Sequence, residues 1–91
     1  MDYYNNYEIT KYTWELTDIE KETLDIAIFI IDNRTTLVNA GNNFMLSKTG
    51  VYGRINKILK SLSPELYNLV HKQFKNNTMY FVKSVVFEFF K

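Results

Sequence analysis

Apolar residues recur at helical spacing through the middle of the chain, and the pattern predicts a helix over residues 19–31. These positions lie three and four residues apart, on a broad side typical of a helix that packs on a core. Thr17 and Glu20 fit a capping box, in which each side chain satisfies a free backbone N–H at the helix start. The Asp-Asn-Arg sequence at residues 32–34 is predicted to end this helix.

Two further helices are predicted on either side of a short turn. The first covers residues 35–44, and residues 45–46 form the turn. Ser47 is predicted to cap the second helix, which continues to about residue 62. The inner side of this second helix carries three apolar residues, Val51, Ile55 and Leu59.

A fourth helix is predicted over residues 64–75. Ser63 is a suitable cap, and Pro64 fits the first helical position, where its missing N–H leaves no bond unmade. Leu66, Leu69, Val70 and Phe74 then recur at helical spacing. The Asn-Asn pair at residues 76–77 is expected to stop the helix.

The two ends of the chain are rich in residues that favour β-strands. Residues 7–16 are open to two interpretations, a strand or an irregular arm held on the domain by Trp14. Residues 78–91 are apolar and aromatic, and they fit either a strand or an amphipathic helix. We favour pairing of the two segments, because it would bury both. The expected fold is mainly α, a helix-turn-helix bundle of four helices, with a small two-stranded β element from the N- and C-terminal segments.

Length and composition indicate one domain with one core. The chain has 91 residues, 46% of them hydrophobic, and it contains no cysteine. We divide it into an N-terminal extension (residues 1–17), a helix-turn-helix core (18–77) and an apolar C-terminal segment (78–91). A chain without cysteine fits a reducing compartment, and no segment reaches the roughly 18 uninterrupted apolar residues of a membrane span. We therefore expect a cytoplasmic protein without membrane association.

The charge of the chain changes sign at Arg34. Residues 1–33 contain two basic and eight acidic residues, a net charge of −6, whereas residues 34–91 contain nine basic and two acidic residues, a net charge of +7. This asymmetry suggests that one face of the molecule meets a polyanion. A dipolar, solvated surface would produce the same asymmetry.

Titratable residues form no catalytic pattern. The single histidine, His71, cannot build a His-rich zinc site. Asp25, Asp32 and Glu65 are too scattered for an acid–base pair. Residues 47–49 lack the preceding glycines of a phosphate-binding loop. We therefore expect no enzyme activity, no cofactor or metal, and no small-molecule ligand.

A known pattern runs in register over residues 21–77. It is carried by Ile26-Ala27, Ile30-Ile31-Asp32, Thr36-Leu37, Phe44, Leu46-Ser47-Lys48-Thr49, Val51, Leu59, Leu62, Pro64-Glu65-Leu66, Val70 and Lys72. Through these residues the chain resembles the stage III sporulation protein D family of helix-turn-helix transcriptional regulators. The resemblance implies sequence-specific binding to double-stranded DNA and gene regulation without a cofactor.

In that family the helix after the turn enters the major groove, and here the corresponding residues are 47–59. Candidates for phosphate contact are the basic residues of the region, Arg34, Lys48, Arg54 and Lys57. Candidates for base contact are the polar residues predicted to face outward, Thr49, Tyr52 and Asn56. Thr36 and Ser47 are expected to cap helices and to donate their hydroxyl groups to phosphates.

The chain departs from the family pattern at several places. Met45 stands where the family usually has glycine, which predicts either a left-handed residue that costs roughly 1 kcal/mol or a different turn. Gly41 replaces the usual alanine. Gly50 and Gly53 occupy positions where the family carries polar, contacting residues. The apolar segment 78–91 replaces the basic segment that follows the last helix in the family.

These departures support a second hypothesis from another functional class. A degenerate helix-turn-helix would act as a protein–protein interaction module, with its aromatic C-terminal segment used for dimerisation or partner docking. The sequence leaves open whether the chain is a homodimer.

Overall fold

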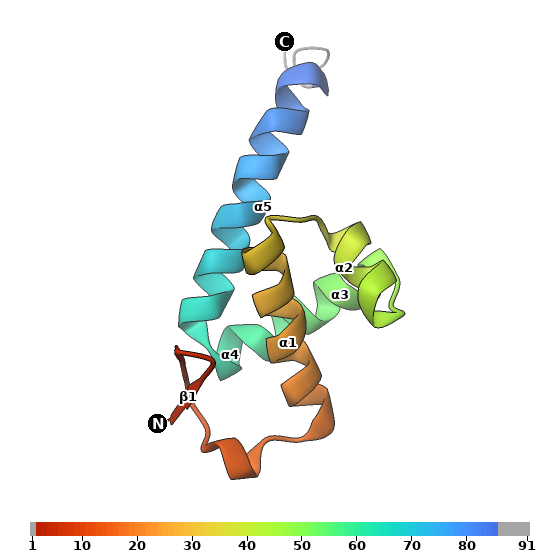
Figure 1. Cartoon of the computed structure of the whole chain (residues 1–91). Helices are drawn as coiled ribbons and strands as arrows, with labels where there is room; N and C mark the ends of the chain where they lie inside the picture. Colours follow the sequence, from red (N-terminus) through yellow and green to blue (C-terminus); the bar gives the residue numbers. More distant parts are fainter. Residues whose placement is uncertain (1, 86–91) are drawn as a thin grey trace.

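The computed structural model describes residues 2–85, which form a hairpin followed by a bundle of helices (Figure 1). The hairpin consists of β1 (Asp2–Tyr4) and β2 (Tyr7–Ile9), and a 3-10 turn, η1 (Thr13–Glu15), leads to the bundle. The helices are α1 (Asp18–Asn33), α2 (Leu37–Phe44), α3 (Lys48–Gly53), the π-helical turn η2 (Arg54–Leu59), α4 (Lys60–Leu62) and α5 (Pro64–Val85). The predicted mainly α fold is confirmed.

Both ends of α1 are set by local chemistry. The Thr17 hydroxyl accepts a hydrogen bond from the Glu20 N–H at 3.1 Å, and the Glu20 carboxylate accepts one from the Thr17 N–H at 2.9 Å. At the other end Arg34 takes a left-handed conformation with a φ of 48°, and its N–H bonds to the carbonyls of the preceding turn. The predicted capping box and helix end are therefore confirmed.

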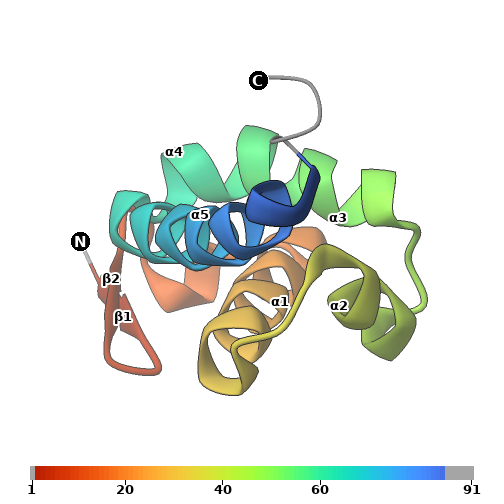
Figure 2. The same ribbon diagram turned by 90° about the horizontal axis from the view of Figure 1, so that it is seen from above.

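The core is built where α1, η2 and α5 pack on one another, with α2 packed on α1 and α3 (Figures 1 and 2). Its fully buried side chains come from these elements and from β2, and they include Ile9, Leu24, Ile26, Ile30, Val51, Ile55, Leu59, Leu66 and Val70. The apolar stripes predicted for the helices account for most of this core.

The segments α3, η2 and α4 form one continuous helix over residues 48–62, here called the 48–62 helix. Gly53, Arg54, Leu59 and Lys60 all keep right-handed helical backbone angles across the junctions. A helix of this length was predicted, but its π-helical centre was not. In a π-helical turn each N–H bonds five residues back, so the winding differs from that of an α-helix.

Among residues 2–85 the small sheet lies within the N-terminal segment, so the predicted pairing with the C-terminal segment is wrong for residues 78–85. Tyr4 pairs with Tyr7, and the turn between them is Asn5-Asn6, with φ angles of 53° and 74°. Two left-handed residues are the mark of a tight hairpin turn, and asparagine tolerates that conformation. A strand closes onto its neighbour at little entropic cost, whereas a distant partner requires a long loop. Residues 78–85 belong to α5, and residues 86–91 lie outside the described part.

The hairpin is fixed to the corner between α4 and α5. The Thr10 N–H donates to the Leu62 carbonyl at 2.8 Å, and the Ser63 hydroxyl donates to the Glu8 carbonyl at 2.6 Å. Ile9 adds a fully buried side chain. One of the two interpretations of residues 7–16 had Trp14 packed on the domain, but Trp14 is 76% exposed and stacks on Tyr12 instead.

The last helix is longer than predicted. Ser63 caps it as expected, because its hydroxyl accepts from the Leu66 N–H at 3.2 Å. Asn76 and Asn77 do not end it, and the helix continues to Val85 (Figure 1). Asparagine is only a mildly unfavourable helix residue, and the sequence from 65 to 85 contains no glycine or proline.

Candidate nucleic-acid interface

The turn between α2 and the 48–62 helix is tight and left-handed. Met45 ends α2 with a φ of 61° and a ψ of 42°. Its N–H and that of Leu46 both bond to the Gly41 carbonyl, the latter at 2.8 Å. Of the two alternatives predicted for Met45, the structure has the left-handed residue, at a cost of roughly 1 kcal/mol. Its side chain is 92% exposed, so no burial offsets this cost.

Gly41 allows the turn to pass this close to α2. A Cβ atom built on Gly41 would collide with the carbonyl oxygen of Leu46. The departure from the family's usual alanine at this position therefore has a steric reason. The same close approach lets two N–H groups share one carbonyl and fixes the angle at which the next helix leaves the turn.

The start and the inner side of the 48–62 helix are as predicted. The Ser47 hydroxyl accepts from the Gly50 N–H at 3.0 Å, so Ser47 is the N-cap. The three predicted inner residues Val51, Ile55 and Leu59 are completely buried. Gly50 is close to the cap, since a Cβ there would lie 3.3 Å from the Ser47 oxygen.

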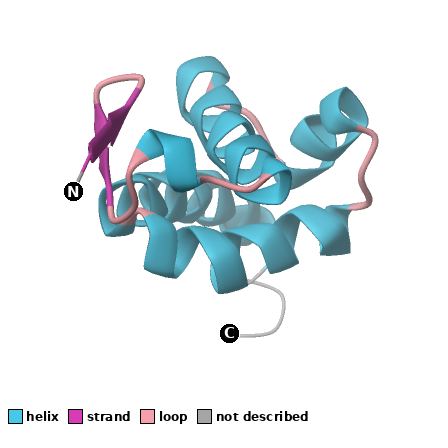
Figure 3. Cartoon of the chain, turned by 90° about the horizontal axis from the view of Figure 1, so that it is seen from below, coloured by secondary structure: helices cyan, strands magenta, loops and turns pink. Residues whose placement is uncertain are grey.

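The outward side of this helix carries hydroxyl and amino groups. Lys48, Thr49, Lys57 and Lys60 are exposed, and Tyr52 is 54% exposed. Figure 3 shows the helix along one edge of the molecule, with its outer side away from α1 and α2. The arrangement can place cations and hydrogen-bond donors along a polyanion.

Arg54 points inward rather than outward. Its guanidinium lies 2.6 Å from the Glu22 carboxylate of α1, and its side chain is only 20% exposed. The ion pair joins η2 to α1. Arg54 is therefore separated from the exposed cations of the same helix.

Asn56 also has partners within the molecule. Its Nδ2 donates to the Tyr52 carbonyl at 3.0 Å, and its Oδ1 lies 3.2 Å from His71 Nε2 and 3.4 Å from the Tyr67 hydroxyl. Tyr67 and His71 belong to α5, so Asn56 connects η2 with α5. Asn56 is only partly exposed, and the next exposed residue after Tyr52 on this helix is Lys57.

Arg34 and Thr36 lie on the connection between α1 and α2. Both are exposed, and the Thr36 hydroxyl caps α2 by accepting from the Asn39 N–H at 3.2 Å. The capping role of Thr36 is confirmed, while its contact with phosphate stays a prediction. The structure thus brings together Ser47, Lys48, Thr49, Tyr52 and Lys57 on one outer side, and it sets Arg54 and Asn56 apart.

Within the described residues, no group of three or more His, Asp or Glu side chains is arranged to hold a metal ion. No helix in residues 2–85 combines the length and the apolar character that crossing a bilayer requires.

A family model described as stage III sporulation protein D matches residues 16–80. The chain belongs to the stage III sporulation protein D family. The match covers α1, the turn and the 48–62 helix, and membership indicates a sporulation-related regulator. No match was found among curated proteins or solved structures. The hairpin lies before the matched residues.

Proposed function

We propose that this member of the stage III sporulation protein D family is a sequence-specific, DNA-binding transcriptional regulator. The observation that carries the proposal is the charge of the 48–62 helix. Every charged residue from 47 to 62 is basic, and three of the four, Lys48, Lys57 and Lys60, are exposed. In this proposal residues 47–59 lie in the major groove of double-stranded DNA, with the turn at Met45 setting the angle of entry.

The exposed residues divide into two roles. Lys48, Lys57 and Arg34 contact phosphates and position the protein, and the Ser47 and Thr36 hydroxyls add to these contacts. Thr49 and Tyr52 face the base edges. The remaining two candidates act indirectly: Arg54 and Asn56 hold the helix against α1 and α5, which keeps its outer side in place.

Few side chains are available for base contact on this surface. Gly50 and Gly53 contribute none, and the Asn56 amide is engaged within the molecule. Phosphate contacts therefore supply most of the affinity, and three of them give a slope of about −3 for log affinity against log salt. Binding is expected to be strongest at low salt.

Fluorescence anisotropy with labelled genomic and random-sequence duplexes, titrated with salt, tests the proposal. Lys48→Ala with Lys57→Ala should weaken binding more than roughly tenfold at low salt and reduce the salt slope by about two. The matched control is Lys21→Ala with Lys72→Ala, which removes two exposed cations outside residues 47–62. No binding at micromolar protein, or equal losses in the two double variants, would contradict the proposal.

A second candidate is a protein–protein interaction module in which the segment 78–91 mediates dimerisation or partner docking. The small number of free polar side chains on the 48–62 helix and the apolar sequence of 78–91 support it. Light scattering of the full chain over a range of concentrations separates the two. A mass that stays monomeric throughout, together with salt-dependent duplex binding, favours the DNA-binding function.

A further inference from the structure

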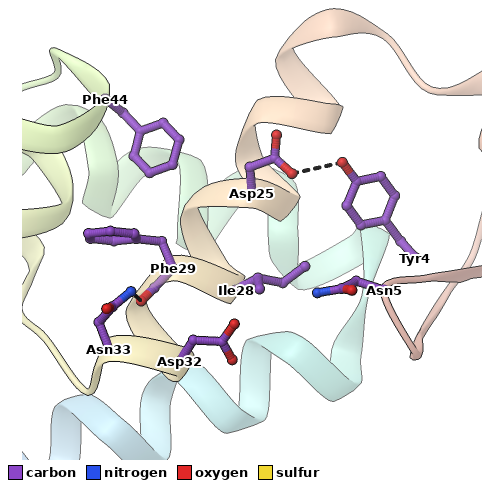
Figure 4. A pocket seen from close by; sticks show the side chains of 8 residues that line it. All are labelled: Tyr4, Asn5, Asp25, Ile28, Phe29, Asp32, Asn33 and Phe44. Atoms are coloured by element: carbon purple, nitrogen blue, oxygen red, sulfur yellow. Dashed lines mark hydrogen bonds between the residues drawn. The ribbon is translucent and has the colours of Figure 1, made fainter.

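An open groove of about 560 Å³ lies along α1, between the hairpin and the end of α2 (Figure 4). Its lining comes from the hairpin, α1 and the end of α2, and consists of Tyr4, Asn5, Asp25, Ile28, Phe29, Asp32, Asn33 and Phe44. None of these residues lies on the 48–62 helix. The groove therefore lies apart from the 48–62 helix, and its end at Asn33 adjoins Arg34, one of the proposed phosphate contacts.

The centre of the groove is apolar. Ile28 is 9% exposed, and Phe29 packs edge-to-face on Phe44 with ring centroids 5.7 Å apart. Phe29 and Phe44 are only partly buried, so apolar surface remains accessible between α1 and α2. A side chain that covers this surface would gain free energy from its removal from water.

Two carboxylates flank the apolar centre, and within residues 2–85 neither of them forms an ion pair. Asp25 accepts a hydrogen bond from the Tyr4 hydroxyl at 2.7 Å, which raises the pKa of Tyr4 to about 12. The Asp32 carboxylate is exposed. Within residues 2–85 the ion pairs join Lys11 to Glu20 and Arg54 to Glu22, so neither involves the groove. The lining contains no lysine, arginine or histidine.

The spacing of the carboxylates defines the shape of a complement. Asp25 and Asp32 are seven residues apart on α1, which corresponds to about two helical turns, or roughly 10 Å. A helix with basic residues at the same interval and apolar residues between them would match both the charge and the apolar centre.

We propose that this groove docks a basic amphipathic helix of a partner protein. Its arginine or lysine side chains pair with Asp25 and Asp32, and its apolar side chains cover Ile28, Phe29 and Phe44. Nucleic acid is disfavoured as an occupant, because its phosphates would face two carboxylates. The proposal does not depend on DNA binding.

The hairpin makes the groove a feature of this chain rather than of the matched family segment. Tyr4 and Asn5 form one wall, and both precede residue 16, where the family match begins. The hairpin is anchored at Glu8 and Thr10, so this wall is held in place. Without it, Asp25 would lose its Tyr4 partner.

The test uses the full chain, labelled with ¹⁵N, and a synthetic helical peptide with two arginines seven residues apart and two leucines between them. Binding should shift the backbone amides of residues 25–33 and of Asn5. Asp32→Asn should weaken binding about twofold to fivefold, because each flanking ion pair is partly exposed. Asp18→Asn is the matched control, since it removes an exposed α1 carboxylate outside the groove. It should change affinity less than about 1.5-fold.

Three results would overturn the proposal. The first is the absence of shifts at the groove at millimolar peptide. The second is equal weakening by Asp32→Asn and Asp18→Asn, or equal binding of a peptide with the same composition in scrambled order, because either would indicate general charge attraction. The third is a shift of the same amides when the protein alone is concentrated, because the occupant would then be a second copy of this chain. Amide spectra of each variant establish that it is folded.

Discussion

The 48–62 helix and the outer side of α1 are both exposed, but they present opposite chemistry. The helix carries only basic charges and exposes three lysines, whereas the groove on α1 is lined by two aspartates. The exposed side of the helix is mainly polar, while the groove has an apolar centre. The sign change at Arg34 in the sequence thus becomes a separation in space, which suits one side to a polyanion and the other to a basic partner.

The two regions also differ in how they use their polar residues. On the 48–62 helix, Arg54 and Asn56 turn inward to α1 and α5, and the lysines remain exposed. On α1, Asp25 and Asp32 are both exposed, and Asp25 also accepts a hydrogen bond from Tyr4 of the hairpin. The neighbours of a charged residue therefore decide whether it makes contacts within the molecule or can contact a partner. The residue type alone does not reveal this.

The largest loss of stability is expected from Gly41→Ala, which disturbs the turn that leads into the basic 48–62 helix. The added Cβ collides with the Leu46 carbonyl, so the turn must move, and the free energy of unfolding should fall by about 2 kcal/mol in urea titrations. Duplex binding should weaken more than peptide binding, because α1 and the hairpin supply all of the groove lining except Phe44.

Gly53→Ala is the control for that substitution. A Cβ at Gly53 meets nothing within 4 Å, so this change should stabilise the helix by about 0.5–1 kcal/mol. A Gly41→Ala variant as stable as the wild type would show that the turn adjusts freely.

An intermediate effect is expected from Arg54→Ala compared with Lys57→Ala. The two substitutions remove the same charge from the same helix, one turned inward and one exposed. Lys57→Ala should reduce the salt slope of duplex binding by about one, whereas Arg54→Ala should leave the slope unchanged. Arg54→Ala should instead lower the free energy of unfolding by about 0.5 kcal/mol. If both lower the slope equally, Arg54 reaches a phosphate.

The smallest effect is expected at the Tyr4–Asp25 hydrogen bond beside the groove, where stability should depend on pH at high pH. The hydrogen bond to Asp25 raises the pKa of Tyr4 to about 12, from 10.0. Stability from this bond is fully present below pH 10, the ordinary value, and is lost as pH rises through about 12. Unfolding titrations should show a wild-type advantage over Tyr4→Phe that declines in this window. An advantage that persists above it would contradict the assignment.

Local signals made much of the fold predictable. The Thr17, Ser47 and Ser63 caps and the stripe of Val51, Ile55 and Leu59 depend on neighbours within a few residues, and the structure confirms them. The Asn5-Asn6 turn was an equally local signal that we missed, and it would have predicted the hairpin.

Other features depend on contacts between distant residues, which no local pattern contains. The inward direction of Arg54 requires Glu22, 32 residues earlier, and that of Asn56 requires His71 on α5. The π-helical turn changes which residue faces outward. The groove needs three separate elements to meet, so neither Asp25 nor Asp32 could be assigned to it from the sequence.

The anchoring of the hairpin has a consequence for folding kinetics. The bonds from Thr10 to Leu62 and from Ser63 to Glu8 join residues 52 and 55 positions apart, whereas the caps and the turn at Met45 close within a few residues. Contacts of long sequence separation form slowly because a large loop must close first. We therefore expect the helices to assemble before the hairpin docks. In pulse-labelled hydrogen exchange the Thr10 amide should gain protection after that of Val51. The 48–62 helix would then be complete before the hairpin adds the Tyr4–Asn5 wall of the groove.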